Sequence, residues 1–315
     1  MDLDTLIITA FCRIHDALND CFADPAGAVR LRQRGPAPAL DDREVLTMEA
    51  VGSFLGLAED TALFAHFRRH GLHLFPALAH VSRTSFTRQA ANLWRVKEAL
   101  WQHLARQTPH DPAFTLVDSF ALPVCRFARA PRCQRFRGQA AFGYDPVARN
   151  TFWGFRVHAL LAWPGVLVRL CIAPANQQEL DVLPELARGQ GGTVLGGTVL
   201  GDTVLGDTVL GDRNYWSPKK RELLASAGAA LRAPFRNKKH DPCPRASAWM
   251  SRLRYRIDTV FGQMCERFAV KQVGARDSWH LISRLLRVAL SHTLMVQINM
   301  SQGHEPLQLD QLLVA

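Results

Sequence analysis

The chain has 315 residues, 48% of them hydrophobic, which is enough for one large core or two cores of ordinary size. Its 38 Lys and Arg against 28 Asp and Glu give a formal net charge of +10, which favours an acidic partner such as nucleic acid. The seven cysteines form no CxxC pair, the first residues lack the basic segment of a signal peptide, and Pro164 and Arg169 interrupt the most apolar stretch, 158–175. These features speak against a disulfide framework, a secretory leader and a membrane span, and predict reduced thiols in a cytoplasm.

The first 108 residues have a helical pattern, with no alternation typical of strands. One helix is expected to begin at Asp41 or Asp42 and to end at Gly56, and another to span 82–107 with Ser82 or Ser85 as its N-cap.

After residue 110 the pattern changes to short apolar runs separated by turn residues. Residues 151–163 and 165–175 flank Pro164-Gly165, which predicts an antiparallel hairpin. The other expected elements are strands over 114–122 and 229–235, helices over 176–188 and 217–228, a long amphipathic helix over 247–268 with Trp249 in its apolar stripe, and a last helix over 279–300. This order predicts an α/β fold, a mixed sheet with flanking helices, preceded by an all-α N-terminal domain.

The positive charge is concentrated in two segments of this second part. Residues 119–156 hold seven Arg and one acidic residue, and residues 231–276 hold eleven Lys or Arg and three acidic residues. Charge gathered in this way predicts a surface for a polyanion rather than general solubility.

Three aspartates are candidates for catalysis. Asp118 and Asp212 each follow an apolar run of strand length, and their carboxylates converge if the two strands are neighbours. Asp258 lies on the long amphipathic helix, one turn after Arg254. Carboxylates grouped in basic surroundings favour divalent cations and phosphoryl transfer, although an Asp after a strand is also an ordinary turn residue.

Several longer motifs resemble the DDE transposases of bacterial insertion sequences, and most closely the insertion-sequence-982 family. They are LVDSFALPVCRFARAPRC, FWGFRVHALLAWPGVLV, IAPANQQELDVLPEL, LGDRNYWSP, APFRNKKHDP and RYRIDTVFGQMCERF. The resemblance covers residues 1–310 and is densest over 114–295. It implies an RNase H-like core whose acidic residues hold two Mg²⁺ or Mn²⁺ ions. It also implies that the enzyme cuts the ends of its element and joins them to target DNA.

Carried over by position, Asp118, Asp212 and Asp258 match the three acidic residues of that family. The third is Glu in the family pattern, so the shorter Asp258 side chain predicts reduced activity. Glu266, two turns further on, is an alternative ligand.

Basic residues are expected to contact DNA. Those assigned in the second part are Arg126, Arg135, Arg236, Lys238, Lys239, Arg254 and Lys271, for each of which a solvated surface is the alternative. The candidates for reading terminal inverted repeats in the N-terminal part are Arg68, Arg69, Arg83, Arg88 and Arg95, with 82–107 as the helix for the groove. We therefore expect a DNA-end-binding domain over 1–110, a catalytic domain over 111–301 and a tail over 302–315.

A run of near-identical pentads, TVLGG once and TVLGD three times, precedes the motif RNYWSP. Only the last copy adjoins that motif, so Asp212 is the expected ligand, and Asp202 and Asp207 belong to an elongated loop or an added hairpin. Tyr215 and Trp216 either stack on a base of the DNA or pack at the start of the following helix.

The expected function is therefore a DNA transposase. Its partners are double-stranded DNA, as terminal inverted repeats and target, and a second copy of the chain, since synapsis of two ends implies at least a dimer. The expected location is the bacterial cytoplasm at the nucleoid, with no membrane. Two alternatives stay open: a catalytically impaired relative that only binds DNA, and an RNase H-like nuclease that does not join strands.

Overall fold

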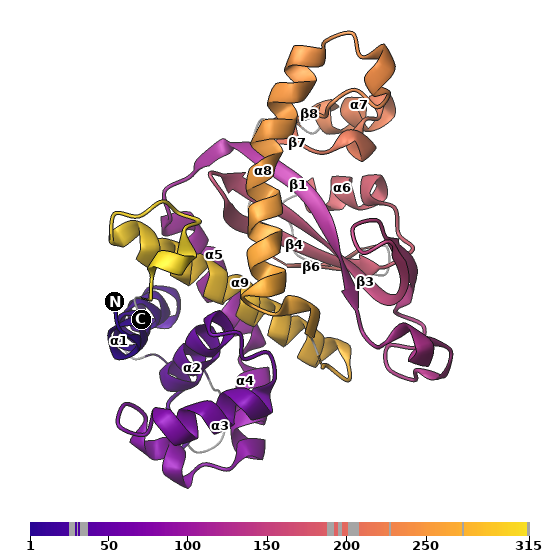
Figure 1. The fold of residues 1–315 in the computed structure, drawn as a ribbon. Helices are drawn as coiled ribbons and strands as arrows, with labels where there is room; N and C mark the ends of the chain where they lie inside the picture. Colours follow the sequence, from indigo (N-terminus) through magenta and orange to yellow (C-terminus); the bar gives the residue numbers. More distant parts are fainter. Residues whose placement is uncertain are drawn as a thin grey trace. The chain divides into compact units, whose positions relative to one another are not determined.

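The computed structural model describes residues 1–24, 29, 31, 37–187, 192–194, 197–200, 208–226, 228–272 and 274–313. The chain forms two compact units, the first from Met1–Thr108 with Gln263–Ala315 and the second from Pro109–Gly262 (Figure 1). The boundary differs from the sequence-based domains, because residues 263–301 pack with the N-terminal helices instead of with the sheet.

The first unit is built from helices. They are α1 (Leu3–Phe22), α2 (Asp42–Phe54), α3 (Asp60–His70), α4 (Arg83–Asn92), α5 (Trp94–Gln107) and α9 (Ser278–Ser301), with the 3₁₀ turns η1 (Pro76–His80), η5 (Val270–Gln272) and η6 (Leu309–Gln311). Of the two predicted N-cap residues, Asp41 caps α2, and it forms a capping box with Glu44.

Helix α9 is the centre of this unit. Nearly all of its residues from Leu285 to Asn299 are buried, and α1, α2, α4 and α5 pack around it. By length and hydropathy α9 could also cross a membrane, but 89% of its most apolar window is buried inside the protein. An α-helix that is buried on all sides needs other elements packed around it, which explains why α9 belongs to the helical unit.

The prediction of one helix over 82–107 is wrong. The chain leaves helical geometry at Leu93 (ψ 12°), so α4 and α5 are separate helices, and Ser82 caps α4 by accepting from the Ser85 amide. The second of them buries Leu100, Trp101 and Leu104 in the unit's core.

The second unit contains an eight-stranded sheet in the order β5-β6-β4-β3-β1-β7-β8, with β2 paired to β3. The strands are β1 (Asp111–Pro123), β2 (Ala141–Asp145), β3 (Asn150–Trp163), β4 (Val166–Pro174), β5 (Gly192–Val194), β6 (Gly197–Leu200), β7 (Thr208–Leu210) and β8 (Ala230–Arg232). The predicted hairpin is confirmed as β3–β4, and β7 and β8 run parallel to β1. The sheet is therefore mixed, and the α/β prediction holds for this unit.

Three helices accompany the sheet. They are α6 (Glu179–Ala187), α7 (Pro218–Ser226) and α8 (Pro244–Glu266), with the 3₁₀ turns η2 (Phe127–Arg132), η3 (Arg213–Tyr215) and η4 (Lys238–His240). Helix α8 packs Phe261 against Phe120 of β1, with ring centroids 4.9 Å apart. The prediction that Trp249 lies in the buried stripe of α8 is wrong, since its side chain is 58% exposed.

The pentads contribute strands to two different parts of the sheet. The first two copies form the β5–β6 hairpin, and β6 extends the sheet beside β4. The last copy forms β7, which pairs with β1 on the other side of the β3–β4 hairpin. An added hairpin is thus present, while Asp202 and Asp207 lie outside the described residues.

Candidate active site

The parallel register of β1 and β7 brings Asp118 and Asp212 to the same level of the sheet. The last pair in this register is Leu116 with Leu210, and each aspartate follows two residues after its leucine. The two strands are neighbours, as the sequence-based argument required, so the carboxylates lie at adjacent positions.

The backbone around Asp212 is fixed by local contacts. Its carboxylate caps η3 by accepting from the Asn214 amide at 2.8 Å and from the Asn214 side chain at 3.1 Å. A Cβ on Gly211 would lie 2.5 Å from Cγ of Tyr215, so only glycine fits before the acid. Tyr215 is fully buried, and Trp216 packs against Arg221 and Phe235. Of the two alternatives for this aromatic pair, the structure thus has the packing one.

Helix α8 supplies a cation and a third carboxylate. The guanidinium of Arg254 donates to the Asp118 carboxylate, and its Nη2 lies 3.9 Å from Oδ1 of Asp258, one turn further along the helix. The Asp118 side chain is 15% exposed, whereas that of Asp258 is 60% exposed. The structure therefore brings Asp118, Asp212, Asp258 and Arg254 together within the second unit.

Burial and mutual repulsion disfavour the charge on these acids. Burial raises the pKa of Asp118 to about 7, with repulsion from Asp212 and Glu179 adding to it and Arg254 opposing it. Burial and the charge of Asp212 also raise the pKa of Asp258. Such an excess of negative charge is the environment in which a further cation binds favourably.

Sequence reasoning missed Glu179, at the start of α6. It accepts a hydrogen bond from the Ser119 hydroxyl at 2.6 Å and one from Arg156 at 3.2 Å, and Ser119 is the residue after Asp118. The sequence signal for Glu179 was an acidic residue at the start of a helix that follows a strand. This signal did not indicate a site, because no local sequence pattern links Glu179 to Ser119.

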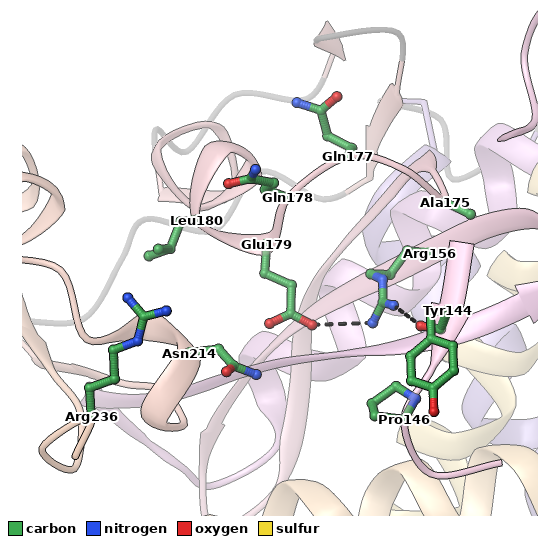
Figure 2. Close-up of a pocket in the computed structure, with 10 residues that line it drawn as sticks. All are labelled: Tyr144, Pro146, Arg156, Ala175, Gln177, Gln178, Glu179, Leu180, Asn214 and Arg236. Atoms are coloured by element: carbon green, nitrogen blue, oxygen red, sulfur yellow. Dashed lines mark hydrogen bonds and ion pairs between the residues drawn. The ribbon is translucent and has the colours of Figure 1, made fainter. Parts of the chain in front are cut away.

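A cavity of about 450 Å³ opens beside these residues (Figure 2). Its lining includes Tyr144, Arg156, Glu179, Asn214 and Arg236, so it adjoins Asn214, the partner of Asp212, and Glu179, the partner of the residue after Asp118. Figure 2 shows Glu179 and Arg156 pointing toward each other. The cavity therefore offers space for part of a substrate next to the carboxylates.

The other basic residues assigned from the sequence are exposed. Arg236 lines the cavity, Lys238 and Lys239 lie in η4, and Arg126 and Arg135 flank η2. Two assigned residues fall in the first unit: Lys271, in η5, and Glu266, exposed in the last turn of α8.

Carboxylate oxygens are the donors that Mg²⁺ and Mn²⁺ prefer, so Asp118, Asp212 and Asp258 fit such an ion by chemistry. In the described part of the chain, however, no three His, Cys, Asp or Glu side chains form a ready metal site. Arg254 pairs with two of the three carboxylates instead. A cation at this site thus requires Arg254 to shift.

The mixed sheet and its grouped carboxylates define an α/β domain with an acidic site of the kind that carries out phosphoryl transfer. Residues 110–277, more than half of the chain, match the family described as the transposase DDE domain, and the chain belongs to this family. No curated protein sequence matches the chain. The structure is also similar to piggyBac transposase in a cryo-EM structure of its synaptic complex with hairpin DNA. That similarity has a TM-score of 0.45 at 12% identity and covers 98% of this chain and 78% of the other.

Proposed function

We propose that the protein is the transposase of a bacterial insertion sequence, which cuts the ends of its element and joins them to target DNA. The observation that carries this proposal is that Asp118 and Asp212 lie at the same level of the sheet, after adjacent strands. Both residues belong to the segment that matches the transposase DDE domain. The mixed sheet around them supports an RNase H-like core for the reaction. The enzyme acts at the nucleoid of the bacterial cytoplasm.

In this proposal Asp118, Asp212 and Asp258 hold two Mg²⁺ or Mn²⁺ ions, which supply Lewis-acid chemistry for phosphoryl transfer when bound. The protein's own groups hold the acids in place. Asn214 fixes the Asp212 carboxylate, and the backbone amide of Ser119 donates to Asp118 at 2.8 Å. Arg254 holds Asp118 by a charge-assisted hydrogen bond, and with a cation bound at the acids its guanidinium would be available for a phosphate of the DNA.

The DNA strand follows exposed arginines and lysines of the second unit. Arg129 and Arg132 lie three residues apart in η2, where such side chains form one row, and Arg126 and Arg135 lie before and after this turn. Arg236, Lys238 and Lys239 provide further phosphate contacts, with Arg236 at the cavity beside the acids. The strands bound are the terminal inverted repeats and the target, and synapsis of two ends takes at least a dimer.

A catalytically impaired relative is the second candidate, favoured by one observation. The carboxylate of Asp258 is 60% exposed and reaches Arg254 only at 3.9 Å, as expected for an acid one methylene too short for its task. A displacement of about 1 Å at a catalytic group can cost about 100-fold in rate.

The test is a cleavage and strand-transfer assay with the full-length protein, Mg²⁺ or Mn²⁺, and DNA carrying the candidate inverted repeats. We expect cleaved and joined products from the native chain, none from Asp118→Asn, and more from Asp258→Glu. No product from the native chain together with rescue by Asp258→Glu identifies the impaired relative. Cleavage without joining, on DNA that lacks inverted repeats, identifies a nuclease instead.

A further inference from the structure

A second cavity, of about 610 Å³, lies wholly within the first unit. It is formed by the N-terminal ends of α3, α4 and α9 and by the segment before α9. The charged and aromatic side chains that line it include Arg83, Arg88, Arg276, Arg284, Asp60 and Trp279. It contains none of the acids assigned to catalysis.

Two carboxylates line this cavity, Glu59 and Asp60, and Asp60 is already neutralised. Asp60 pairs with Arg284 at 2.7 Å and with Arg287 at 2.8 Å, and these arginines hold its pKa below the usual range although burial acts in the opposite direction. Glu59 is then the carboxylate left to balance Arg83, Arg88 and Arg276, so the cavity keeps an excess of positive charge.

Three guanidinium groups are left without a partner. Throughout the described ranges, Arg83, Arg88 and Arg276 form no hydrogen bond, ion pair or ring contact, and all three are exposed. They come from α4 and from a segment almost 190 residues further along the chain. Guanidinium groups that converge on one cavity match the oxygens of a phosphate, which can accept several of their hydrogen bonds at once.

An aromatic ring completes the site. Trp279 is 38% exposed and packs edge-on against His280, with ring centroids 4.8 Å apart. Thr84 and Thr87 add hydroxyl groups on the α4 side. An exposed ring beside unpaired cations is suited to a sugar or base that is attached to the phosphate.

We infer that this cavity binds the phosphodiester backbone of DNA, with a phosphate on Arg83, Arg88 and Arg276 and its sugar or base against Trp279. The inference rests on the proposed function, because that function makes DNA the polyanion present. Among the N-terminal arginines predicted to contact DNA, the inference assigns this contact to Arg83 and Arg88. Arg68 instead donates to the carbonyls of Ala79 and Val81 and so holds the chain together.

The test compares two double variants that lose the same charge in the full-length protein. Arg83→Gln/Arg88→Gln removes two cations of the cavity, and Arg13→Gln/Arg106→Gln removes two cations of the same unit that lie outside it and are not predicted to contact DNA. Affinity for a short duplex is measured by fluorescence anisotropy at several salt concentrations, without divalent metal, and folding of each variant is checked by thermal melting.

We expect the cavity variant to bind at least about tenfold more weakly near 100 mM salt, and its slope of log K against log salt to fall by about two. The control variant should change the slope by much less, and Trp279→Phe should reduce the DNA-induced quenching of tryptophan fluorescence. Equal losses in both doubles would show only general charge attraction and overturn the inference. Release of DNA by inorganic phosphate at micromolar concentration would identify a small-anion site and also overturn it.

The inference and the proposed function can fail independently of each other. If the native chain cuts and joins DNA but the cavity variant binds DNA normally, the inference fails alone. If the cavity variant loses affinity while the native chain shows no cleavage with Mg²⁺, the site stands and the proposed reaction fails.

Discussion

The guanidinium of Arg254 on α8 donates a hydrogen bond to the carboxylate of Asp118 on β1, 136 positions earlier in the chain. The pair is mostly buried, with side chains 19% and 15% exposed. Arg254 thus occupies the place of a counter-ion among three aspartates, and opposes the burial that raises the pKa of Asp118. In the proposed function, a divalent cation would compete with this arginine for the same carboxylate.

Replacing Arg254 should therefore make the stability of the protein depend on a divalent cation. Arg254→Ala leaves Asp118 without its partner, and we expect a loss of about 1–3 kcal/mol of unfolding free energy without metal, less than for a fully buried pair. Added Mg²⁺ should restore part of the loss, since it supplies the missing charge. Thermal melting with and without Mg²⁺ measures this, with Arg254→Lys as the control that keeps the charge. Equal Mg²⁺ effects on native protein and Arg254→Ala would contradict the competition.

The repeated pentads allow a direct comparison of three chemically identical aspartates. Asp212 ends the copy that forms β7 and pairs with β1, whereas Asp202 and Asp207 end earlier copies. We expect Asp212→Ala to abolish strand transfer, and Asp202→Ala and Asp207→Ala to retain it. The same assay on all three variants decides the matter, and an equal loss in all three would refute the assignment of Asp212.

Gly211, which precedes Asp212, should tolerate substitution as poorly as the aspartate itself. Gly211→Ala forces a methyl group against the ring of Tyr215, for a cost of about 1–3 kcal/mol and a displaced carboxylate. Gly262→Ala is the control, because no atom lies within 4 Å of its new Cβ and alanine favours the helix by about 0.5–1 kcal/mol. Chemical denaturation of both variants should give changes of opposite sign. A Gly211→Ala protein as stable as the native one would mean that Tyr215 moves aside at no cost.

Elements that depend on local sequence were predictable. The β3–β4 hairpin follows from two apolar runs around Pro164-Gly165, and the start of α2 from the pair Asp41-Asp42. Features that depend on tertiary packing were not. The break at Leu93 is one such feature, and the burial of α9 in the helical unit is another.

The same distinction holds for the candidate site. Asp118 and Asp212 were found because each follows an apolar strand, but their common level depends on a strand register that no local pattern records. Glu179 reaches Ser119 across 60 positions and through a hydrogen bond, so only the folded chain reveals it.

A buried ion pair in the first unit should govern the stability of that unit. Lys97 is fully buried and donates to Glu49 at 2.8 Å and to the Ser283 hydroxyl at 2.9 Å. Lys97→Met leaves the Glu49 carboxylate buried beside only a more distant Arg287, for an expected loss of about 3–5 kcal/mol. Lys97→Met/Glu49→Leu should lose less than the single variant, because no uncompensated carboxylate remains. Denaturant titration of both variants checks this, and additive losses would contradict it.

Acid should destabilise the first unit through His292. Burial lowers the pKa of this histidine to about 4 from 6.5, and one ring nitrogen lies 3.1 Å from the Gln263 side-chain oxygen. Because the folded state favours the neutral ring, the contribution of His292 is complete above about pH 6.5 and is lost as the pH falls toward 4. The loss amounts to about 3 kcal/mol. His292→Gln should remove this part of the pH dependence, whereas His304→Gln, an exposed histidine of the same unit, should retain it. Unfolding free energies measured from pH 7 to pH 4 distinguish the two variants, and parallel curves for native protein and His292→Gln would assign the acid sensitivity to other groups.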